Sequence, residues 1–372
     1  KMKLLLLKKT INFLYHFFSF LFPTNKNKVT LCTNRSDSLS GNLKNIYQVM
    51  QSDEELQIKI VCFNYHRSLR GKINYFWYSI IALFHLATSS VFIIDDYFFP
   101  IYCIHNKKKQ NQIIQVWHAI GHLKKYGLSI QKNTESIINH HSNYDWVLAN
   151  AESDRFALVD SFAISPDKVI ITGAPRLDDL TKLGSPSISD TKIKLLYAPT
   201  YRTAKNDDPA YEYINNFLAE FSKQFTNESI KLYVSLHPYF KLDKIIEVNN
   251  SKIEIFQDTS RSSSLLSKVD CLITDYSSLL LDYSFFEKSI KIYAPDYEEY
   301  TKSVGFFVDY QEYLGLPIYK TATDLINCLF EFPIKEKECI QRLKQENFPF
   351  LDSKNSERAY LFVKKIMTEK SK

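Results

Sequence analysis

Residues 270–296 read DCLITDYSSLLLDYSFFEKSIKIYAPD and carry a clear alternation of strand and helix patterns. The apolar run CLIT predicts a strand, the residues that follow it through Asp282 predict a helix, and IKIYAPD predicts a second strand. A strand, a crossover helix and a second strand make up the βαβ unit from which parallel sheets are built. Because both strands are almost continuously apolar, we expect both of their faces to be covered.

The same alternation continues in both directions along the chain. Short β-branched runs predict further strands at residues 28–33, 57–63, 90–95, 112–117, 146–150, 168–173, 194–200, 231–238 and 253–256. Helical patterns fit between most of these strands, for example over residues 151–162, and two more, over residues 335–345 and 355–368, close the chain. The whole pattern predicts an α/β fold with parallel, doubly wound sheets.

The length of the chain indicates two domains. At 372 residues it is too long for one ordinary core. A polar stretch with glycine, proline and serine, TKLGSPSISDT at residues 181–191, interrupts the pattern and is the expected linker. We therefore expect Rossmann-like domains over residues 1–180 and 192–372. They should face a cleft, with ligands at the carboxyl ends of the strands.

Composition limits the kinds of partner. The net charge of +6 is mild and makes anionic partners easier to approach. Because lysine and arginine are spread along the chain and nearly balanced by acidic residues, we do not expect nucleic acid as a partner. The six cysteines stand singly, which indicates reduced thiols in a cytoplasmic protein. Asp95 and Asp96 form an acidic pair without a further carboxylate cluster, so we expect no dedicated metal site.

Two apolar segments raise the question of a membrane. Residues 4–22, LLLLKKTINFLYHFFSFLF, are long enough to span one but are interrupted by two lysines, an asparagine and a histidine. They fit either a helix that lies in the membrane interface or a helix packed on the sheet of the first domain. Residues 73–94 contain a polar break before VFIIDD and predict a buried helix followed by a strand. We predict no transmembrane span.

Two histidines follow predicted strands. His118 comes after QIIQVW, and the loop continues with a glycine and then Lys124 and Lys125, which sets a titratable base beside cations suited to phosphate. For this segment, a loop histidine with solvated lysines is the alternative. His237 ends the strand KLYVSL in the second half of the chain. One histidine in each domain predicts two imidazoles on opposite walls of one cleft.

The segment after CLIT carries a candidate phosphate site. Asp275, Ser277 and Ser278 precede a helix, where hydroxyls and free backbone N–H groups favour an anion, although ordinary N-capping is the alternative. Arg202 follows LYAPTY and is suited to bind phosphate as a planar fork. Arg176 follows the turn GAP beside the linker, where a hinge is the alternative. The sequence contains neither GxxxxGK[ST] nor GxGxxG.

Taken together, these segments resemble the CDP-glycerol glycerophosphotransferases of wall teichoic acid synthesis. The matching segments stand in the family's order over roughly residues 90–315 and are VWHAIGHLKKYG, ANAESDRFAL, ITGAPRLDDL, LLYAPTYR, SLHPYF, DCLITDYSSLLLDYSFFEKSIKIYAPDYEEY and GFFVDY. The resemblance implies a GT-B-type fold. In such a fold the C-terminal domain, residues 192–372, binds the donor, and residues 1–180 face the acceptor and the membrane.

The resemblance also implies site residues. His118 and His237 match the family's strand-end histidines that act in transfer. The rest of the predicted site consists of Thr200, Arg202, Thr274, Asp275, Ser277 and Ser278 for the donor, and Lys124, Lys125 and Arg176 for the acceptor or a phosphate. The loop reads WHAIGHLKKYG where the polymerase type tends to read WHGTPLKKLG, which favours a primase that adds one or a few units.

The implied reaction transfers glycerol phosphate, or a related polyol phosphate, from CDP-glycerol or CDP-ribitol to an undecaprenyl-diphosphate-linked saccharide and releases CMP. The polyol and the kind of saccharide, teichoic or capsular, stay open at this point. We expect no tightly bound cofactor and a peripheral protein on the anionic cytoplasmic face of the membrane. A GT-B glycosyltransferase with a nucleotide-sugar donor is one alternative. A non-catalytic protein that binds anionic lipid or nucleic acid is the other.

Overall fold

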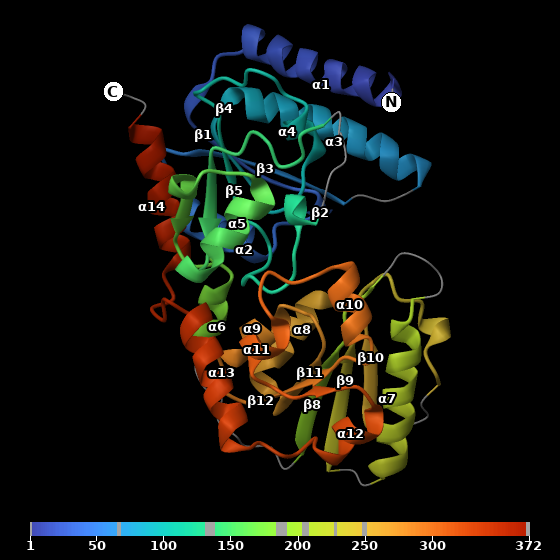
Figure 1. Cartoon of the computed structure of the whole chain (residues 1–372). Coiled ribbons are helices and arrows are strands. Elements are labelled where there is room, and N and C mark those ends of the chain that lie inside the picture. The colour runs from blue at the N-terminus through green and yellow to red at the C-terminus, as the bar shows by residue number, and fades with distance from the viewer. Residues whose placement is uncertain are drawn as a thin grey trace. The chain divides into compact units, whose positions relative to one another are not determined.

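The structure, a computed structural model, describes residues 2–64, 68–130, 138–183, 192–202, 208–226, 229–247 and 251–369 (Figure 1). The chain divides into two compact units. The first comprises residues 1–121, 125–181 and 348–372, and the second comprises residues 122–124 and 182–347. Most of the predicted linker, residues 184–191, lies outside the described residues, and α6 (Leu177–Leu183) extends into its first positions.

The first unit is built on a seven-stranded sheet with the order β2-β3-β1-β4-β5-β6-β7. Its strands are β1 (Asn25–Thr33), β2 (Arg35–Ser36), β3 (Gln57–Asn64), β4 (Ser89–Ile94), β5 (Gln112–Gln115), β6 (Trp146–Ala149) and β7 (Val169–Ile171). All neighbours run parallel except β2, which pairs antiparallel with the end of β3. Every strand predicted in this half of the chain is present. The short β2 has no sequence pattern of its own.

Helices cover both faces of this sheet (Figure 1). Those of the first unit are α1 (Met2–Leu21), α2 (Gly41–Met50), α3 (Leu69–Thr88), α4 (Phe99–Tyr102), α5 (Arg155–Phe162), α6 and α14 (Asn355–Thr368). Val91 and Ile93 of β4 are buried in one core with α2, and Phe92 and Ile94 are buried in another with α3. Successive residues of β4 thus face opposite layers, which explains its continuous apolar run.

The C-terminal helix α14 belongs to the first unit, which corrects the prediction that residues 192–372 form one domain. Its apolar side packs with α2 in the first unit's core. The carboxylate of Asp178 accepts hydrogen bonds from the backbone N–H groups of Asn355, at 2.9 Å, and Ser356, at 2.8 Å. A side chain far away in the sequence therefore caps the start of α14 and holds it in this unit.

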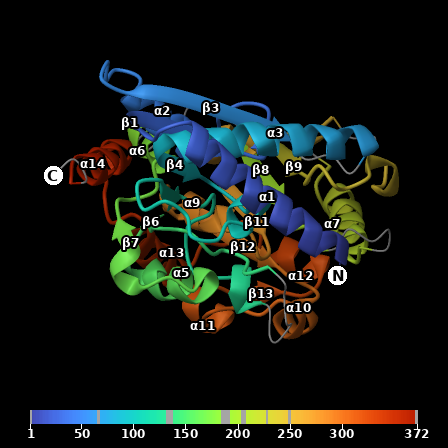
Figure 2. The same cartoon turned by 90° about the horizontal axis from the view of Figure 1, so that it is seen from above.

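α1 lies beside α3 (Figures 1 and 2). Both helices expose apolar side chains. One stripe of α1 is buried, and the hydroxyl of Tyr15 donates a 2.6 Å hydrogen bond to Asn111 Oδ1. The exposed apolar residues include Met2, Leu6, Phe13, Phe20, Leu69, Ile73, Phe76, Trp77 and Ile81. The predicted buried helix is therefore wrong for the first turns of α3, since the burial is concentrated in its last turns. No helix in the described part of the chain is long and apolar enough to cross a membrane.

The second unit is built on a six-stranded parallel sheet with the order β10-β9-β8-β11-β12-β13. Its strands are β8 (Ile193–Ala198), β9 (Ile230–Ser235), β10 (Ile253–Phe256), β11 (Cys271–Thr274), β12 (Ser289–Tyr293) and β13 (Ile318–Tyr319). Its helices are α7 (Ala210–Gln224), α8 (Thr259–Leu265), α9 (Leu279–Ser284), α10 (Tyr297–Ser303), α11 (Tyr310–Leu314), α12 (Ala322–Asn327) and α13 (Ile334–Asn347). The opening stretch thus forms β11, α9 and β12, as predicted.

In each sheet the strand order reverses at one point. From β1 the first sheet grows to β3 on one side and to β4 on the other, so the carboxyl ends of β1 and β4 border its switch point. In the second sheet β8 and β11 border the corresponding point. Ligands of open α/β sheets bind outside the strand ends at such points. The residues that follow these strands are therefore the first candidates for function.

Candidate functional site

His118 lies near the switch point of the first unit. Its Nδ1 is 3.4 Å from the carbonyl oxygen of Asp95 and 3.8 Å from Asp96 Oδ2, and the Nε of Arg35 is 3.1 Å from the same carboxylate oxygen. A carbonyl oxygen only accepts hydrogen bonds, so this contact assigns the proton of the neutral ring to Nδ1. Nε2 then keeps its lone pair. The arrangement is that of a base held by a carboxylate, which is itself held by a guanidinium.

The electrostatic surroundings keep His118 neutral. Burial and the positive charge of Arg35 lower its pKa to about 4, although the carboxylate of Asp96 acts in the opposite direction. Above that pH the imidazole is uncharged and can accept a proton at Nε2. A histidine in this state suits general-base catalysis at neutral pH.

Trp117 fixes the direction in which His118 leaves the strand. Its φ of +42° is rare for a bulky residue and indicates backbone strain. Asn42 Nδ2 donates to the Trp117 carbonyl at 2.7 Å, and the Trp117 N–H donates to Gln115 Oε1 at 2.8 Å. The indole ring stacks on Tyr126, with ring centroids 5.2 Å apart. These contacts hold the strained backbone at Trp117, directly before His118.

The predicted cations divide between the two units. Arg176 lies close enough to His118 for its charge to contribute to the lowered pKa of the imidazole, and its backbone N–H donates to Asn42 Oδ1 at 3.0 Å. Lys125 also belongs to the first unit. Lys124 belongs to the second unit, where its backbone forms an antiparallel bridge with Phe306. The two adjacent lysines therefore belong to different units.

Arg202 follows β8 at the switch point of the second unit, but it is not the free fork that the sequence predicts. Its Nε and Nη2 each lie 3.0 Å from an Asp296 carboxylate oxygen, and its Nη1 lies 2.5 Å from Asp275 Oδ2. The Thr200 carbonyl takes a further bond from Nη1. Burial lowers the pKa of Arg202, but the two carboxylates outweigh burial and raise it. The guanidinium thus ties three loops together instead of facing a ligand.

The neighbours of Arg202 are arranged by the same network. Asp275 also accepts the Thr200 backbone N–H, at 2.9 Å and 3.0 Å from its two oxygens, and is buried. The hydroxyl of Thr274 is buried and donates to the Ala198 carbonyl at 2.7 Å, so its predicted contact with the donor is corrected to a contact within the sheet. By contrast, the Thr200 hydroxyl is buried without a hydrogen-bond partner among the described residues. A buried unpaired hydroxyl calls for a partner such as a ligand.

Lys124, Ser277 and Ser278 lie at the same end of the second unit. Burial and the positive charge of Arg202 lower the pKa of Lys124, partly offset by the negative charge of Asp275. Ser277 Oγ accepts the Leu279 backbone N–H at 3.3 Å. Ser278 precedes α9 and makes no side-chain capping bond. These residues supply a cation and hydroxyl groups at the same end of the unit as the Thr200 hydroxyl.

His237 follows β9, the neighbour of β8. Its Nδ1 accepts the Tyr239 backbone N–H at 3.2 Å, so the proton of the neutral ring lies on Nε2. The ring stacks on Tyr201, with centroids 5.6 Å apart, and partial burial lowers its pKa. His118 therefore offers a lone pair at Nε2, whereas His237 offers an N–H group. The prediction that they face each other across a cleft concerns the relative placement of the two units and stays a prediction.

Sequence reasoning did not find three of the residues that organise these sites. Arg35 had no role, Asp96 was considered only as half of an acidic pair, and Asp296 was only the end of a strand segment. Each follows a strand by two or three residues, which is a usable signal. Which strands become neighbours, and hence which side chains meet, depends on the topology of the whole sheet.

Comparison with known proteins gives a consistent result. A model of the family described as CDP-Glycerol:Poly(glycerophosphate) glycerophosphotransferase matches residues 14–365. The teichoic acid ribitol-phosphate primase of Bacillus spizizenii is 28% identical over 373 residues, which cover 95% of this chain and 95% of that protein. The teichoic acid glycerol-phosphate primase of Bacillus subtilis is 31% identical over 245 residues, 62% of each chain.

Among solved structures, the wall teichoic acid polymerase TagF matches with a TM-score of 0.72 and 19% identity, over 99% of this chain and 96% of that chain. At 19% identity, this similarity is evidence for the fold alone. It confirms the predicted GT-B type with two Rossmann-like domains.

Proposed function

The chain belongs to the CDP-glycerol:poly(glycerophosphate) glycerophosphotransferase family, and from this premise we propose that it moves a polyol phosphate from a CDP-polyol to a lipid-linked saccharide. It is a transferase of teichoic acid synthesis. The observation that carries the proposed chemistry is the neutral His118, whose Nδ1 side faces Asp95 and Asp96 and whose Nε2 keeps a lone pair.

On the acceptor side we assign His118 as the general base. Its Nε2 takes the proton of the acceptor hydroxyl while the hydroxyl oxygen attacks the β-phosphorus of the donor. The new P–O bond forms as the bond from the β-phosphorus to the bridging oxygen breaks, and CMP leaves with that electron pair. Asp96 and Arg35 position the imidazole. Lys125 and Arg176, also in the first unit, are assigned to a phosphate near His118.

On the donor side we assign the diphosphate to groups of the second unit. The Nε2–H of His237 and the unpaired hydroxyl of Thr200 donate hydrogen bonds to phosphate oxygens, and Lys124 supplies positive charge. Ser277 and Ser278 add hydroxyls. Phosphoryl transfer needs chiefly positioning and charge stabilisation, which such groups provide.

Arg202 and Asp275 act in this proposal as positioning residues. Asp275 fixes the backbone of Thr200 and the guanidinium of Arg202, so the network sets the place of the Thr200 hydroxyl. This role replaces the direct phosphate contact predicted for Arg202, because the Nε and Nη2 groups of its guanidinium already donate hydrogen bonds to the Asp296 carboxylate.

The choice of donor tests the proposed function. We expect purified protein to release CMP from CDP-glycerol or CDP-ribitol only when a short-chain lipid-linked disaccharide is present. The polyol that supports release then identifies the donor. Release of UDP from UDP-N-acetylglucosamine, with no CMP from either CDP-polyol, would instead place the chain among the nucleotide-sugar glycosyltransferases.

We also propose that α1 and α3 attach the protein peripherally to an anionic membrane surface. Phe76 and Trp77 of α3 are 45% and 59% exposed, and Arg70 and Lys72 lie exposed nearby. Apolar side chains beside cations favour an anionic interface.

Exchange of Phe76 and Trp77 for glutamate should lower binding to vesicles with anionic phospholipid by at least about tenfold. Ile334→Glu, at another exposed apolar position, is the control. Deletion of α1 is less informative because Tyr15 is fully buried. Vesicle binding equal to that of the wild type would exclude α3 as the attachment surface.

A further inference from the structure

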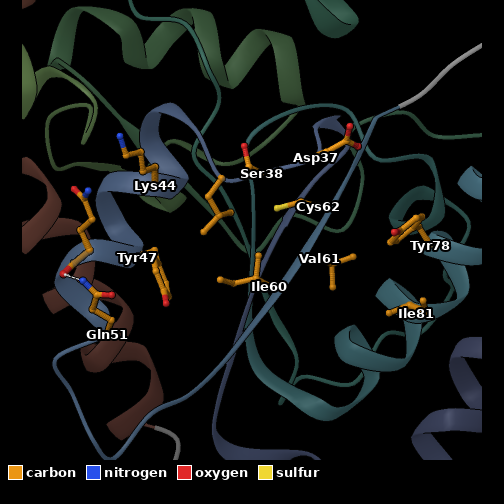
Figure 3. A pocket seen from close by; sticks show the side chains of 12 residues that line it. Asp37, Ser38, Lys44, Tyr47, Gln51, Ile60, Val61, Cys62, Tyr78 and Ile81 are labelled. Atoms are coloured by element: carbon orange, nitrogen blue, oxygen red, sulfur yellow. Dashed lines mark hydrogen bonds between the residues drawn. The ribbon is translucent and has the colours of Figure 1, made fainter. Parts of the chain in front are cut away.

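A groove in the first unit is lined neither by His118 nor by the donor residues. It encloses about 720 Å³, within the size range of small-molecule sites. Side chains of α2 line one side, side chains of α3 line the other, and β3 lies between them (Figure 3). Tyr47 and Tyr78 stand on opposite sides, with Ile60 and Val61 between them. None of the residues that line it was given a role in the transfer step.

One part of the groove is apolar and continues onto α3. Ile60 and Ile81 are each 45% exposed. Ile81 follows Leu69, Ile73 and Trp77 at steps of four residues, and all four are exposed. Residues spaced by four lie on one face of a helix, so they form a single apolar ridge that ends in the groove. Contiguous exposed apolar surface of this kind marks a binding surface.

The other part of the groove is polar. Lys44, Gln48 and Gln51 lie at spacings of four and three on α2 and its C-cap, so they share one face. The Lys44 ammonium has no ion-pair partner within the ranges that the structure describes. Asp37 and Ser38 form the rim near the start of α2. They follow Arg35 by two and three residues, so the polar rim leads towards the Asp96 and His118 cluster.

We infer that this groove binds the head of the lipid-linked saccharide acceptor. The inference rests on the proposed function and locates its acceptor. Lys44 pairs with the diphosphate, the sugar lies over Tyr47 with its hydroxyls on the polar rim, and the first part of the lipid chain follows Ile60 and Ile81 onto the α3 ridge. The groove suits an amphiphile because its polar rim, with Lys44, can bind the charged and sugar groups, and its apolar part can bind the lipid chain.

Binding of a defined probe tests the inference. The probe is a disaccharide diphosphate with a farnesyl-length prenyl chain, titrated calorimetrically into wild type, Ile60→Glu and Lys44→Glu. Each substitution should raise the Kd by about tenfold or more. Ile60→Glu buries a charge under the prenyl chain, and Lys44→Glu repels the diphosphate. Leu361→Glu, at a 62% exposed apolar position of α14, is the matched control and should leave the Kd unchanged.

Further measurements separate the inference from related explanations. Vesicle binding and the KM for the CDP-polyol should be unchanged in Ile60→Glu. Wild-type affinity for the probe in both groove variants, with CMP release intact, would overturn the groove and leave the proposed function standing. Equal affinity for prenyl diphosphate without sugar, or for an anionic phospholipid, would overturn the assignment to a saccharide. If no donor yields CMP, the proposed function fails, while the titration still decides the groove.

Discussion

His118→Ala should lower the rate of acceptor-dependent CMP release by about 10²- to 10⁴-fold, the usual contribution of a positioned general base. With the proton on Nδ1, the imidazole keeps a lone pair at Nε2 that can accept the proton of the acceptor hydroxyl. Its side chain is 32% exposed, so truncation leaves no large cavity and the fold should persist. The measurement is kcat with saturating donor and acceptor, together with a thermal melt of both proteins.

Two controls decide the role of His118. His105→Ala, at an exposed histidine in the same unit, should retain the wild-type rate. In wild type, kcat/KM should stay level from pH 7 down to about pH 5, because the imidazole with its pKa of about 4 loses its lone pair only on protonation below that range. His118 would not be the general base if folded His118→Ala turned over at the wild-type rate. The same conclusion would follow if kcat/KM of the wild type fell at acidic pH with a pKa near 6.5, the ordinary value for histidine.

Arg202→Leu should destabilise the second unit by about 3–5 kcal/mol, because it leaves two buried carboxylates without their cation. The side chains of Arg202, Asp275 and Asp296 are only 8%, 3% and 7% exposed. Water therefore cannot replace the lost partner without opening the loops after β8, β11 and β12. Urea unfolding, followed separately by a probe in each unit, measures the loss and locates it.

Two further variants show how much of the loss in stability comes from the burial of the carboxylates and how much from the lost charge of Arg202. Lys320→Met removes a cation from Glu298, but both side chains are about half exposed, so the cost should stay within about 1 kcal/mol. Arg202→Lys keeps the charge and loses the planar fork, so its stability should lie between those of Arg202→Leu and the wild type. If Arg202→Leu were as mild as Lys320→Met, the network would not organise the Thr200 loop.

The predictable part of the fold follows from local physics. β4 has every residue buried, and β11 likewise, so each contains an unbroken apolar run and was recognised as a strand. β2 and β13 span two residues each, which is too short for any periodic signal. α14 was predicted as a helix but placed in the wrong domain. Its capping partner Asp178 lies 177 residues away from Asn355, and local pattern carries no such information.

The candidate site shows the same division. A residue that follows a strand is visible in the sequence, and His118, Arg202 and Asp275 were all found in this way. What each residue contacts is not visible. Arg202 was expected to bind phosphate, yet Asp275 and Asp296 from two other loops close on it. Arg35 meets Asp96 only because β1 and β4 are neighbours across the switch point.

Mass spectrometry of the acceptor after reaction shows which group the enzyme transfers and whether the transfer depends on His118. The short-chain lipid-linked disaccharide would be incubated with enzyme, CDP-glycerol, CDP-ribitol and UDP-N-acetylglucosamine together, alongside a His118→Ala reaction. We expect the wild-type enzyme to give an acceptor that is heavier by one or a few polyol phosphates. The His118→Ala variant should leave the acceptor nearly unmodified. An acceptor that gains an N-acetylhexosamine, or that gains polyol phosphate equally well without His118, would contradict this expectation.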